Sequence, residues 1–379
     1  MAEAAAAAGA TPLLPGIPDE IAIWEILVRL PPKSLLRCRA VCPTWRRATS
    51  TRHFLLAHHH RQPALPLLYG YNFIGDDVES LDVIPFNHQA GVAAADQLQS
   101  VARLAQPTPR LDACFLLEAC CDGLLVLSAL YPPNFSICNP ATRDFAPLPQ
   151  LYGFTLLGMY PNPPTGESEY RLLLYQASTN LAQGGSYVYE LGSGQPPRHI
   201  GCPDAKKLIH SPVSLLFRGS LHWCTTNQIM VFDTTTESFR QICSPIVPAG
   251  DTELFEMGGM LAMSCLNDER TTLDIWVMPK YEAEVWAFKN HVELPIGEIR
   301  LQSGNCDYWN VVVTSWDGDV LVQVQIDDWL LQVNIDGKLV SSIHRRGLSP
   351  TEHRLTQSLV RHTFFPTLEG YVVNASPFI

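Results

Sequence analysis

The sequence lacks the signatures of the common catalytic and nucleotide-binding sites. It contains no G-x-S-x-G nucleophile elbow, no G-x-G-x-x-G or G-x-x-x-x-G-K-[ST] phosphate loop and no H-E-x-x-H zinc motif. Its 11 cysteines are odd in number and include no C-x-x-C pair, so neither a zinc ribbon nor a full disulfide framework is indicated. We therefore expect no cofactor, no metal and no catalytic role. Reduced thiols predict a cytoplasmic or nuclear protein.

The sequence also lacks a recognisable membrane or export segment. The uncharged run from Gly123 to Thr142 contains three prolines and cannot form a membrane-spanning helix. The Ala-rich opening has no apolar core, and no basic residue precedes Arg29, so it does not read as a signal or transit peptide. We expect no membrane association, and we expect residues 1–16 to be a disordered tail.

Apolar residues are abundant enough for a large folded core. The chain has 379 residues, of which 46% are hydrophobic and 17% are charged. This composition predicts one large domain together with a smaller one, and excludes overall disorder. The sequence pattern changes near residue 62, from helical periodicity to short strand-like runs. We therefore expect a helical domain at residues 17–61 and a β domain at residues 62–379.

The pattern of residues 17–61 predicts three short helices with much apolar surface. Pro18, followed by Asp19 and Glu20, is typical of a helix start. Helical spacing predicts two apolar faces on the first helix, one with Ile23, Ile26, Leu27 and Leu30, the other with Ile21, Trp24 and Val28. Pro31 and Pro32 end this helix; a second starts near Lys33, and a third follows Pro43 and carries Trp45. We expect residues 53–61 to continue this helical pattern.

Two interpretations of the second apolar face are open on composition alone. A unit of about 45 residues buries little of its surface and can cover only one such face. The other face either packs against the rest of the chain or forms an interface with another protein.

The spacing of these residues resembles the F-box. The matching elements are Ile17-Pro18-Asp19-Glu20-Ile21, Ile26-Leu27, Leu30-Pro31-Pro32-Lys33-Ser34-Leu35-Leu36-Arg37, Val41 and Trp45-Arg46. One conservative departure is Ile17, where the family more often has Leu. The resemblance implies docking on the small adaptor subunit of a cullin–RING ubiquitin ligase. It implies these adaptor-binding residues: Ile17, Pro18, Ile21, Leu30, Pro31, Ser34, Leu35, Leu36, Arg37, Val41 and Trp45.

The charge of the helical segment agrees with a protein partner. Residues 17–61 hold eight basic residues against three acids, whereas the whole chain has a net charge of −11. Basic residues can indicate nucleic acid, but here they are scattered among apolar positions without aromatic stacking residues. An acidic protein explains them equally well, and adaptors of this class are acidic. We therefore expect no nucleic-acid partner.

The β region repeats two elements. The first is a Gly-centred turn between strands, centred on Gly123, Gly219, Gly258-Gly259 and Gly318. The second is a strand followed by a polar turn, beginning near Ile137, Val188, Val231, Ile275 and Val333. The steps between these positions are 51, 43, 44 and 58 residues, and four strands per step of about 45 residues is typical of β-propeller blades. A β-sandwich is the alternative. Residues 87–110 break the pattern and are interpreted as an insertion, partly helical or disordered. The two ends of a propeller must be joined, and the apolar segments Leu67–Tyr71 and Gly370–Val373 are the expected closure partners.

Residues 111–345 also resemble the F-box-associated domain of plant F-box proteins. The resemblance rests on Cys121-Asp122-Gly123-Leu124-Leu125, Cys138-Asn139-Pro140-Ala141-Thr142-Arg143, Phe217-Arg218-Gly219-Ser220-Leu221-His222-Trp223, Phe232-Asp233-Thr234, Leu273-Asp274-Ile275-Trp276-Val277-Met278, Glu284-Val285-Trp286 and Val292-Glu293-Leu294-Pro295. It implies a propeller-like domain that recruits a target protein, without saying which. The glycine pairs are too few for a kelch array, and the Trp-Asp pair is misplaced for a WD40 repeat.

Other chemistry-bearing residues have simpler interpretations. His58-His59-His60 is a possible metal tract, but adjacent helical histidines point in different directions. His210, His222 and Cys224 are a possible zinc set, but His222 and Cys224 fit alternate positions of one strand. Asp327-Asp328 fits a turn, and Trp223, Trp276 and Trp286 fit core positions.

The expected fold class is α+β multidomain, with a small three-helix F-box before a mainly antiparallel all-β propeller-like domain. The expected function is the substrate-recognition subunit of an SCF-type ubiquitin ligase. The F-box would dock the adaptor, and the β domain would recruit an unknown target protein. The alternative is a propeller enzyme or a carbohydrate- or ligand-binding protein that acts outside the ligase.

Overall fold

The computed structural model describes most of the chain in two compact units. The described residues are 17–75, 77–86, 98–106, 114–130, 133–162, 169–177, 184–201, 213–225, 228–246, 251–303, 308–316 and 319–379. One unit comprises residues 1–63 and 357–361, and the other comprises residues 64–356 and 362–379. No helix in these described ranges is long and apolar enough to cross a lipid bilayer.

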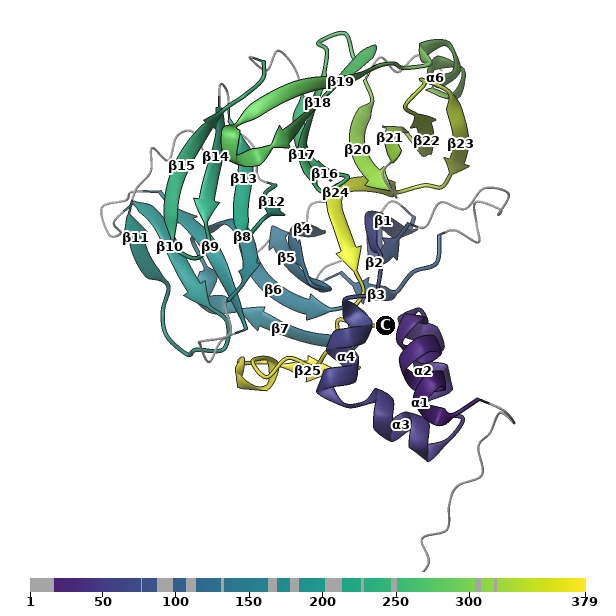
Figure 1. Cartoon of the computed structure of the whole chain (residues 1–379), viewed down its shortest axis with the longest axis vertical. Coiled ribbons are helices and arrows are strands. Elements are labelled where there is room, and N and C mark those ends of the chain that lie inside the picture. Colours follow the sequence, from purple (N-terminus) through teal and green to yellow (C-terminus); the bar gives the residue numbers. More distant parts are fainter. Residues whose placement is uncertain are drawn as a thin grey trace, which may run out of the picture. The chain divides into compact units, whose positions relative to one another are not determined.

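The first unit is helical (Figure 1). Its elements are α1 (Asp19–Ile21), η1 (Ala22–Ile26), η2 (Leu27–Arg29), α2 (Pro32–Cys38), α3 (Pro43–Thr49) and α4 (Arg52–His59). Prolines occupy the first positions of α2 and α3, where a missing N–H costs no helical bond. Thr51 caps α4 by accepting a hydrogen bond from the Phe54 N–H at 3.3 Å. The predicted helices are confirmed, including helix in the 53–61 segment.

Buried apolar side chains from the short helices meet in one small core. Leu27, Val28, Leu35 and Phe54 are fully or almost fully buried. Trp24 packs its ring against Phe54, with centroids 5.4 Å apart. Each buried aliphatic side chain contributes about 1.5–3 kcal/mol, so this core favours the packed arrangement of the helices.

The second unit is a six-bladed β-propeller, with six sheets among the described strands (Figure 1). We number the blades from the first strand after the helices. Blade 1 contains β24 (Leu348–Thr356), β1 (Ala64–Ile74), β2 (Asp77–Pro85) and β3 (Ala102–Ala105). Blade 2 contains β4 (Phe115–Cys121), β5 (Leu124–Leu130), β6 (Pro133–Asn139), β7 (Asp144–Leu148) and β25 (Val372–Val373). Blade 3 contains β8 (Thr155–Pro161), β9 (Tyr170–Gln176), β10 (Gly185–Glu190) and β11 (Arg198–Gly201).

The remaining three blades have the same four-stranded antiparallel order. Blade 4 contains β12 (Leu215–Phe217), β13 (Ser220–Cys224), β14 (Gln228–Asp233) and β15 (Ser238–Cys243). Blade 5 contains β16 (Thr252–Met257), β17 (Met260–Leu266), β18 (Thr272–Lys280) and β19 (Val285–Glu293). Blade 6 contains β20 (Asn310–Trp316), β21 (Asp319–Ile326), β22 (Trp329–Asn334) and β23 (Leu339–His344). The predicted propeller is therefore confirmed, and the sandwich is excluded.

Both repeated sequence elements fall at equivalent places in the blades. Gly123, Gly219 and Gly259 lie in the turns between the first two strands of blades 2, 4 and 5, each with positive φ. Such turns match the right-handed twist of a hairpin. The second element begins in the third strand of its blade each time, in β6, β10, β14, β18 and β22. The remaining predicted turn, at Gly318, lies outside the described residues.

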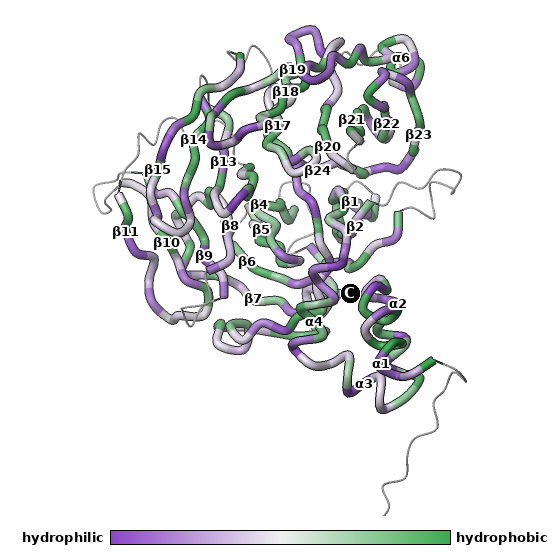
Figure 2. Tube along the Cα trace, viewed as in Figure 1, coloured by the Kyte–Doolittle hydropathy of each residue, from purple (hydrophilic) through white to green (hydrophobic). Residues whose placement is uncertain are grey.

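Apolar side chains fill the seams between neighbouring blades. Each of the six seams holds a cluster of buried apolar residues in the described part of the chain. Hydrophobic residues accordingly run along the strands (Figure 2). The six seams together close the ring, because blade 6 packs on blade 1 through Leu321, Leu330 and Leu348.

The strand that closes the ring differs from the sequence prediction. Leu67–Tyr71 and Gly370–Val373 were the predicted closure partners, and the prediction is right only for the first. β1 pairs with β24 instead, with Ala64 opposite Thr356 and Gly70 opposite Leu348. β25 pairs with β7 at the outer edge of blade 2. The chain end then continues to blade 1, where Phe378 pairs with Leu104.

The insertion predicted at residues 87–110 is partly wrong. Residues 102–105 form β3, which pairs with β2 from Ser80–Ala105 to Val83–Ala102. A four-residue strand in an Ala-rich context carries little β signal, and the pairing with β2 and Phe378 decides its structure. Residues 87–97 and 107–110, like the predicted tail at residues 1–16, lie outside the described residues.

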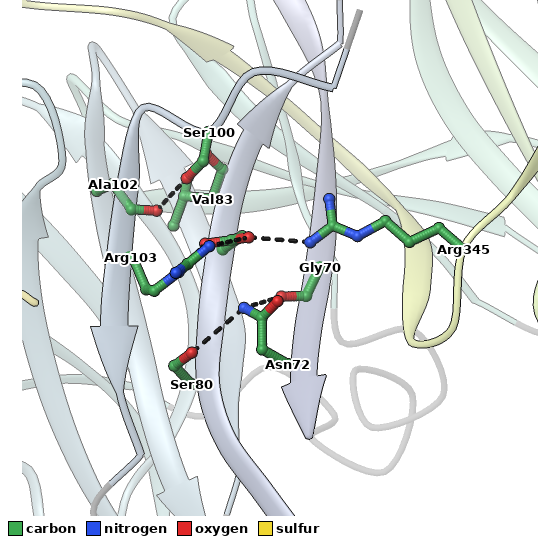
Figure 3. A network of polar contacts seen from close by, with 9 residues as sticks. Gly70, Asn72, Ser80, Val83, Ser100, Ala102, Arg103 and Arg345 are labelled. Atoms are coloured by element: carbon green, nitrogen blue, oxygen red, sulfur yellow. Dashed lines mark hydrogen bonds and ion pairs between the residues drawn. The ribbon is translucent and has the colours of Figure 1, made fainter. Parts of the chain in front are cut away.

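A polar network links blade 1 to the connection between β23 and β24 (Figure 3). Asp82 on β2 accepts two hydrogen bonds from Arg103 on β3, at 2.7 and 3.1 Å. It also accepts one from Arg345, which lies between β23 and β24. The Asp82 side chain is 4% exposed, so these bonds satisfy a buried carboxylate.

Candidate protein-interaction surface

The first helical stretch is a π-helix in its middle, which changes the faces it presents. The N–H of Leu27 bonds to the carbonyl of Ala22, five residues earlier. Residues five apart therefore share a side, so Ile23 and Val28 are both buried and Ile21 and Ile26 are both exposed. The prediction that grouped Ile26 with Ile23 and Val28 with Ile21 is wrong, because it assumed α-helical spacing throughout.

Five large apolar side chains between residues 17 and 41 face solvent, and we call them the exposed apolar surface. Their exposed fractions are 38% for Ile17, 49% for Ile21, 44% for Ile26, 43% for Leu36 and 58% for Val41. They come from the chain before α1, from α1 and η1, from α2 and from the turn after α2. So many exposed apolar residues on a unit of this size are typical of a protein-binding site.

The residues that resemblance assigned to adaptor binding fall into three classes of burial. The exposed ones are Ile17, Pro18, Ile21, Pro31, Leu36, Arg37 and Val41. Leu30, Ser34 and Trp45 are half-buried. Leu35 is fully buried, so it supports α2 from below and offers no surface of its own. Leu35 and Leu36 therefore have different roles, although they are neighbours in the motif.

The turn that carries Leu30 is held by a buried histidine on α4. His58 Nε2 donates to the Leu30 carbonyl oxygen at 2.8 Å, and Gln62 Nε2 donates to the same oxygen at 3.2 Å. Burial lowers the pKa of His58, so it acts as a neutral anchor. His58 is buried, His59 is half-buried and His60 is exposed, so the three do not converge on a metal.

Arg39 is half-buried and bonds within the helical unit. Its Nε donates to Thr49 Oγ1 at 3.1 Å, and its Nη2 donates to the Thr49 carbonyl at 2.5 Å. Burial, and secondarily the charge of Arg361, lowers the pKa of Arg39. Arg37 is exposed by contrast. Of these two arginines, Arg37 is therefore the one placed to attract an acidic partner.

Two exposed apolar residues escaped the sequence prediction. Ile26 is exposed because of the π-helix, and its only signal was the spacing of five from Ile21. Leu56, on α4, is 38% exposed, and nothing in the sequence marked it. Ile26 is part of the exposed apolar surface, whereas Leu56 lies on a different helix.

The other candidate sites prove structural in the described residues. His222 and Cys224 are alternate residues of β13, as predicted. His222 is buried, bonds to Ser220 and Tyr281, and has its pKa lowered to about 4 by burial. His210 lies outside the described residues. No group of three or more His, Cys, Asp or Glu in the described ranges is arranged to hold a metal ion.

The predicted tryptophans and the acidic pair lie in the propeller. Trp223 is a core residue, 1% exposed, and its indole N–H donates to the Leu157 carbonyl at 2.9 Å. Trp276 and Trp286 are only half-buried, which corrects their assignment to the core. They lie on β18 and β19, the two outer strands of blade 5, which are partly exposed to solvent. Asp327 and Asp328 form the turn between β21 and β22, as predicted.

Comparison with known protein families matches both units. Residues 14–62 match the F-box-like family, and residues 87–362 match the family described as the F-box associated beta propeller domain. The second match alone covers more than half of the chain.

Relatives among known proteins agree. An F-box protein of Arabidopsis thaliana is 24% identical over 302 residues, which cover 73% of this chain and 79% of the relative. An F-box/kelch-repeat protein of the same plant is 24% identical over 313 residues, which cover 74% of this chain and 70% of the relative. Among solved structures, a chain of a nidogen–laminin complex aligns with a TM-score of 0.43 and 11% identity, covering 76% of this chain and 99% of that one.

Proposed function

We propose that this chain, which belongs to the family of F-box proteins with an F-box-associated β-propeller domain, is the substrate-recognition subunit of an SCF-type cullin–RING ubiquitin ligase. In this proposal residues 17–61 bind the adaptor subunit and residues 62–379 bind the target protein. The chain itself is a non-catalytic receptor. It acts in the cytoplasm, in the nucleus or in both.

The observation that carries the proposal is the exposed apolar surface. Ile17, Ile21, Ile26, Leu36 and Val41 together offer the kind of surface that a partner buries. All but Ile26 were assigned to the adaptor by resemblance, and Ile26 is part of the F-box motif. Buried Leu35 holds α2 in place beneath Leu36, so the surface is preformed.

Charge supports the same partner. Arg37 is exposed on α2, beside Leu36, and Lys33 is exposed one turn earlier. Exposed basic residues around an apolar centre favour an acidic partner and speed its approach. They add less to the final affinity, because exposed charges are screened by salt.

The mechanism needs no chemistry from this chain. Holding the target close to the ubiquitin-charged conjugating enzyme turns an encounter between two molecules into a reaction within one assembly. The receptor therefore supplies proximity and orientation, and the conjugating enzyme supplies the reactive thioester.

The decisive experiment is binding of the purified full chain to the purified adaptor, followed by co-purification of the cullin. We expect a complex with wild-type protein and loss of that complex with Leu36→Asp. The matched control is Leu56→Asp, which changes an equally exposed leucine on α4. If folded wild-type protein binds no adaptor of this class, the ligase function is wrong, and a propeller enzyme or ligand-binding protein outside the ligase becomes the better hypothesis.

A further inference from the structure

The connections of the propeller fall at two ends of its strands. Within every blade the strands are antiparallel, so successive connections alternate between the ends. Ala64 and Thr356 are paired at one end, where the propeller chain begins and β24 finishes; we call it the entry end. The connections β1–β2, β7–β8 and β19–β20 belong to the opposite end, which we call the far end.

The most exposed large apolar side chains of the described propeller all lie at the far end. Leu301 is 83% exposed, Tyr152 67%, Tyr308 65% and Ile74 64%. Leu301 and Tyr308 belong to the β19–β20 connection, Tyr152 to β7–β8 and Ile74 to the β1–β2 hairpin. At the entry end the highest value is 59%, at Val285. Leu301 and Tyr308 share one connection, and exposed apolar residues on the loops of a rigid scaffold mark a binding surface.

The β19–β20 connection holds its exposed residues on a fixed base. α6 (Ile296–Ser303) buries Ile299 in the seam between blades 5 and 6. That packing leaves Glu298 and Leu301 facing solvent.

Tyr308 is held by an arginine from the neighbouring connection. The Arg270 guanidinium carbon lies 4.3 Å from the centre of the Tyr308 ring. Arg270 Nη1 also donates to the Trp309 carbonyl at 2.7 Å, and its Nη2 pairs with Asp251. Because Arg270 is anchored on both sides, the exposed ring of Tyr308 has a fixed support.

The same end of blades 5 and 6 is negatively charged. The acids of its described connections are Asp251, Asp268, Glu269, Glu298, Asp327 and Asp328, against the bases Arg270, Arg300, Arg345 and Arg346. Arg270 pairs with Asp251 and Arg345 pairs with Asp82, so acids still outnumber bases among the remaining residues. Two further carboxylates lie on inner strands, where burial and neighbouring acids raise the pKa of Glu253, and burial and Asp251 raise that of Glu352 to about 7. A cationic partner would relieve this repulsion.

We propose that the far end of blades 5 and 6 is the target-binding surface, and that it takes a protein segment rich in Lys or Arg. This inference rests on the proposed function. Asp268, Glu269, Glu298, Leu301 and Tyr308 form the acidic–aromatic surface that does so. The carboxylates pair with Lys or Arg side chains of the target, and Leu301 and the exposed part of Tyr308 contact its apolar side chains. The surplus of acids excludes a nucleic-acid backbone.

The test uses a random dodecapeptide library displayed on phage and selected on the immobilised full chain. We expect the recovered peptides to be enriched in Lys and Arg. Synthetic copies should bind the triple variant Asp268→Asn/Glu269→Gln/Tyr308→Ala at least about tenfold more weakly, which corresponds to about 1.4 kcal/mol, by fluorescence anisotropy. Affinity for wild-type protein should fall with added salt.

The matched control is Val285→Ala/Asp336→Asn, which alters exposed residues in entry-end turns and should bind the peptides as wild type does. Peptides without a basic bias, peptides that bind the triple variant equally well, or a selection that yields no peptide dependent on Tyr308 would overturn the inference. Adaptor binding is measured on the same preparations. A chain that binds the adaptor but fails the peptide test disproves only the far-end surface, whereas failure to bind the adaptor disproves the proposed function.

Discussion

Arg345 Nη2 donates a hydrogen bond to Asp82 Oδ2 across 2.9 Å, although 263 positions separate the two residues. The bond joins the connection before β24 to β2, and so reinforces the blade that closes the ring (Figure 3). Gly70 makes room for it, because a Cβ there would lie 2.6 Å from the same guanidinium nitrogen. The first and last parts of the propeller are therefore held together by a charge pair as well as by the β1–β24 pairing.

Replacing Asp82 by Asn should destabilise the propeller. The change removes the charge from three hydrogen bonds to arginine, and bonds to charged groups contribute about 1.5–3 kcal/mol each. Because the Arg103 side chain is partly exposed, its two bonds contribute less to stability than buried bonds would. We expect a clearly lower melting temperature for Asp82→Asn. We expect a smaller loss for Gly70→Ala, which displaces Arg345 and crowds Ile84 Cδ1 at 3.0 Å but leaves the Asp82–Arg103 bonds in place. The control is Asp336→Asn, in an exposed turn; equal melting of Asp82→Asn and wild type would refute a closing role.

Lowering the pH should weaken the hydrogen bonds of the same network. Burial alone would raise the pKa of Asp82, but its hydrogen bonds to Arg103 and Arg345 outweigh burial and lower it. A group whose folded pKa is depressed contributes its full stability above the unfolded pKa, about 3.9, and loses it as pH falls through the folded value. The difference in melting temperature between wild type and Asp82→Asn should therefore shrink below about pH 4. A constant difference down to pH 2 would contradict this.

Glu352 should show the opposite dependence near neutral pH. Desolvation by the surrounding protein and the neighbouring Asp251 raise its pKa to about 7, although Glu352 is exposed to solvent. Between about pH 4.5 and 7 the folded state holds a proton that the unfolded state has lost, so stability falls as pH rises. Glu352→Gln should gain stability over wild type across that window, measured by thermal melting. Glu369→Gln, at an exposed position, controls for loss of one carboxylate, and identical curves for wild type and Glu352→Gln would exclude the effect.

The chain end should stabilise two blade edges at once. Deleting residues 366–379 removes β25 from the edge of β7 and Phe378 from its pairing with Leu104. It also removes the buried side chains of Leu368 and Phe378, each contributing about 1.5–3 kcal/mol. The truncated chain should melt at a clearly lower temperature. Melting like the full chain would mean that neither edge needs its cover.

The sequence predicted the propeller because its repeats obey local rules. Turns with two positive-φ residues need Gly, and buried third strands need apolar residues, so both recur wherever a blade recurs. The sequence prediction failed where pairing between strands far apart in the chain determines the structure. The sequence pattern favoured Gly370–Val373 over β24 as the partner of Leu67–Tyr71, because β24 is largely polar, with two leucines among its nine residues. It also failed at Ile26, where one π-helical hydrogen bond turns the side chain outward. Most of the motif positions are exposed, as the resemblance implied. The burial of Leu35 could not be predicted from the sequence, because it depends on how the helices pack.

The last prediction separates two adjacent leucines of the helical unit. Leu36 is 43% exposed and Leu35 is fully buried, so a carboxylate has different consequences at each. Leu36→Asp places a charge in the exposed apolar surface and leaves the core intact. It should abolish adaptor binding, because an unpaired charge in a buried interface costs several kcal/mol, while the helices keep their circular dichroism signal. Leu35→Asp places the charge in the core and should unfold the helices as well. Arg37→Glu should mainly slow association, with a loss that grows as salt is lowered. If Leu36→Asp binds the adaptor as tightly as wild type, the exposed apolar surface is not the docking site, whatever Leu35→Asp does.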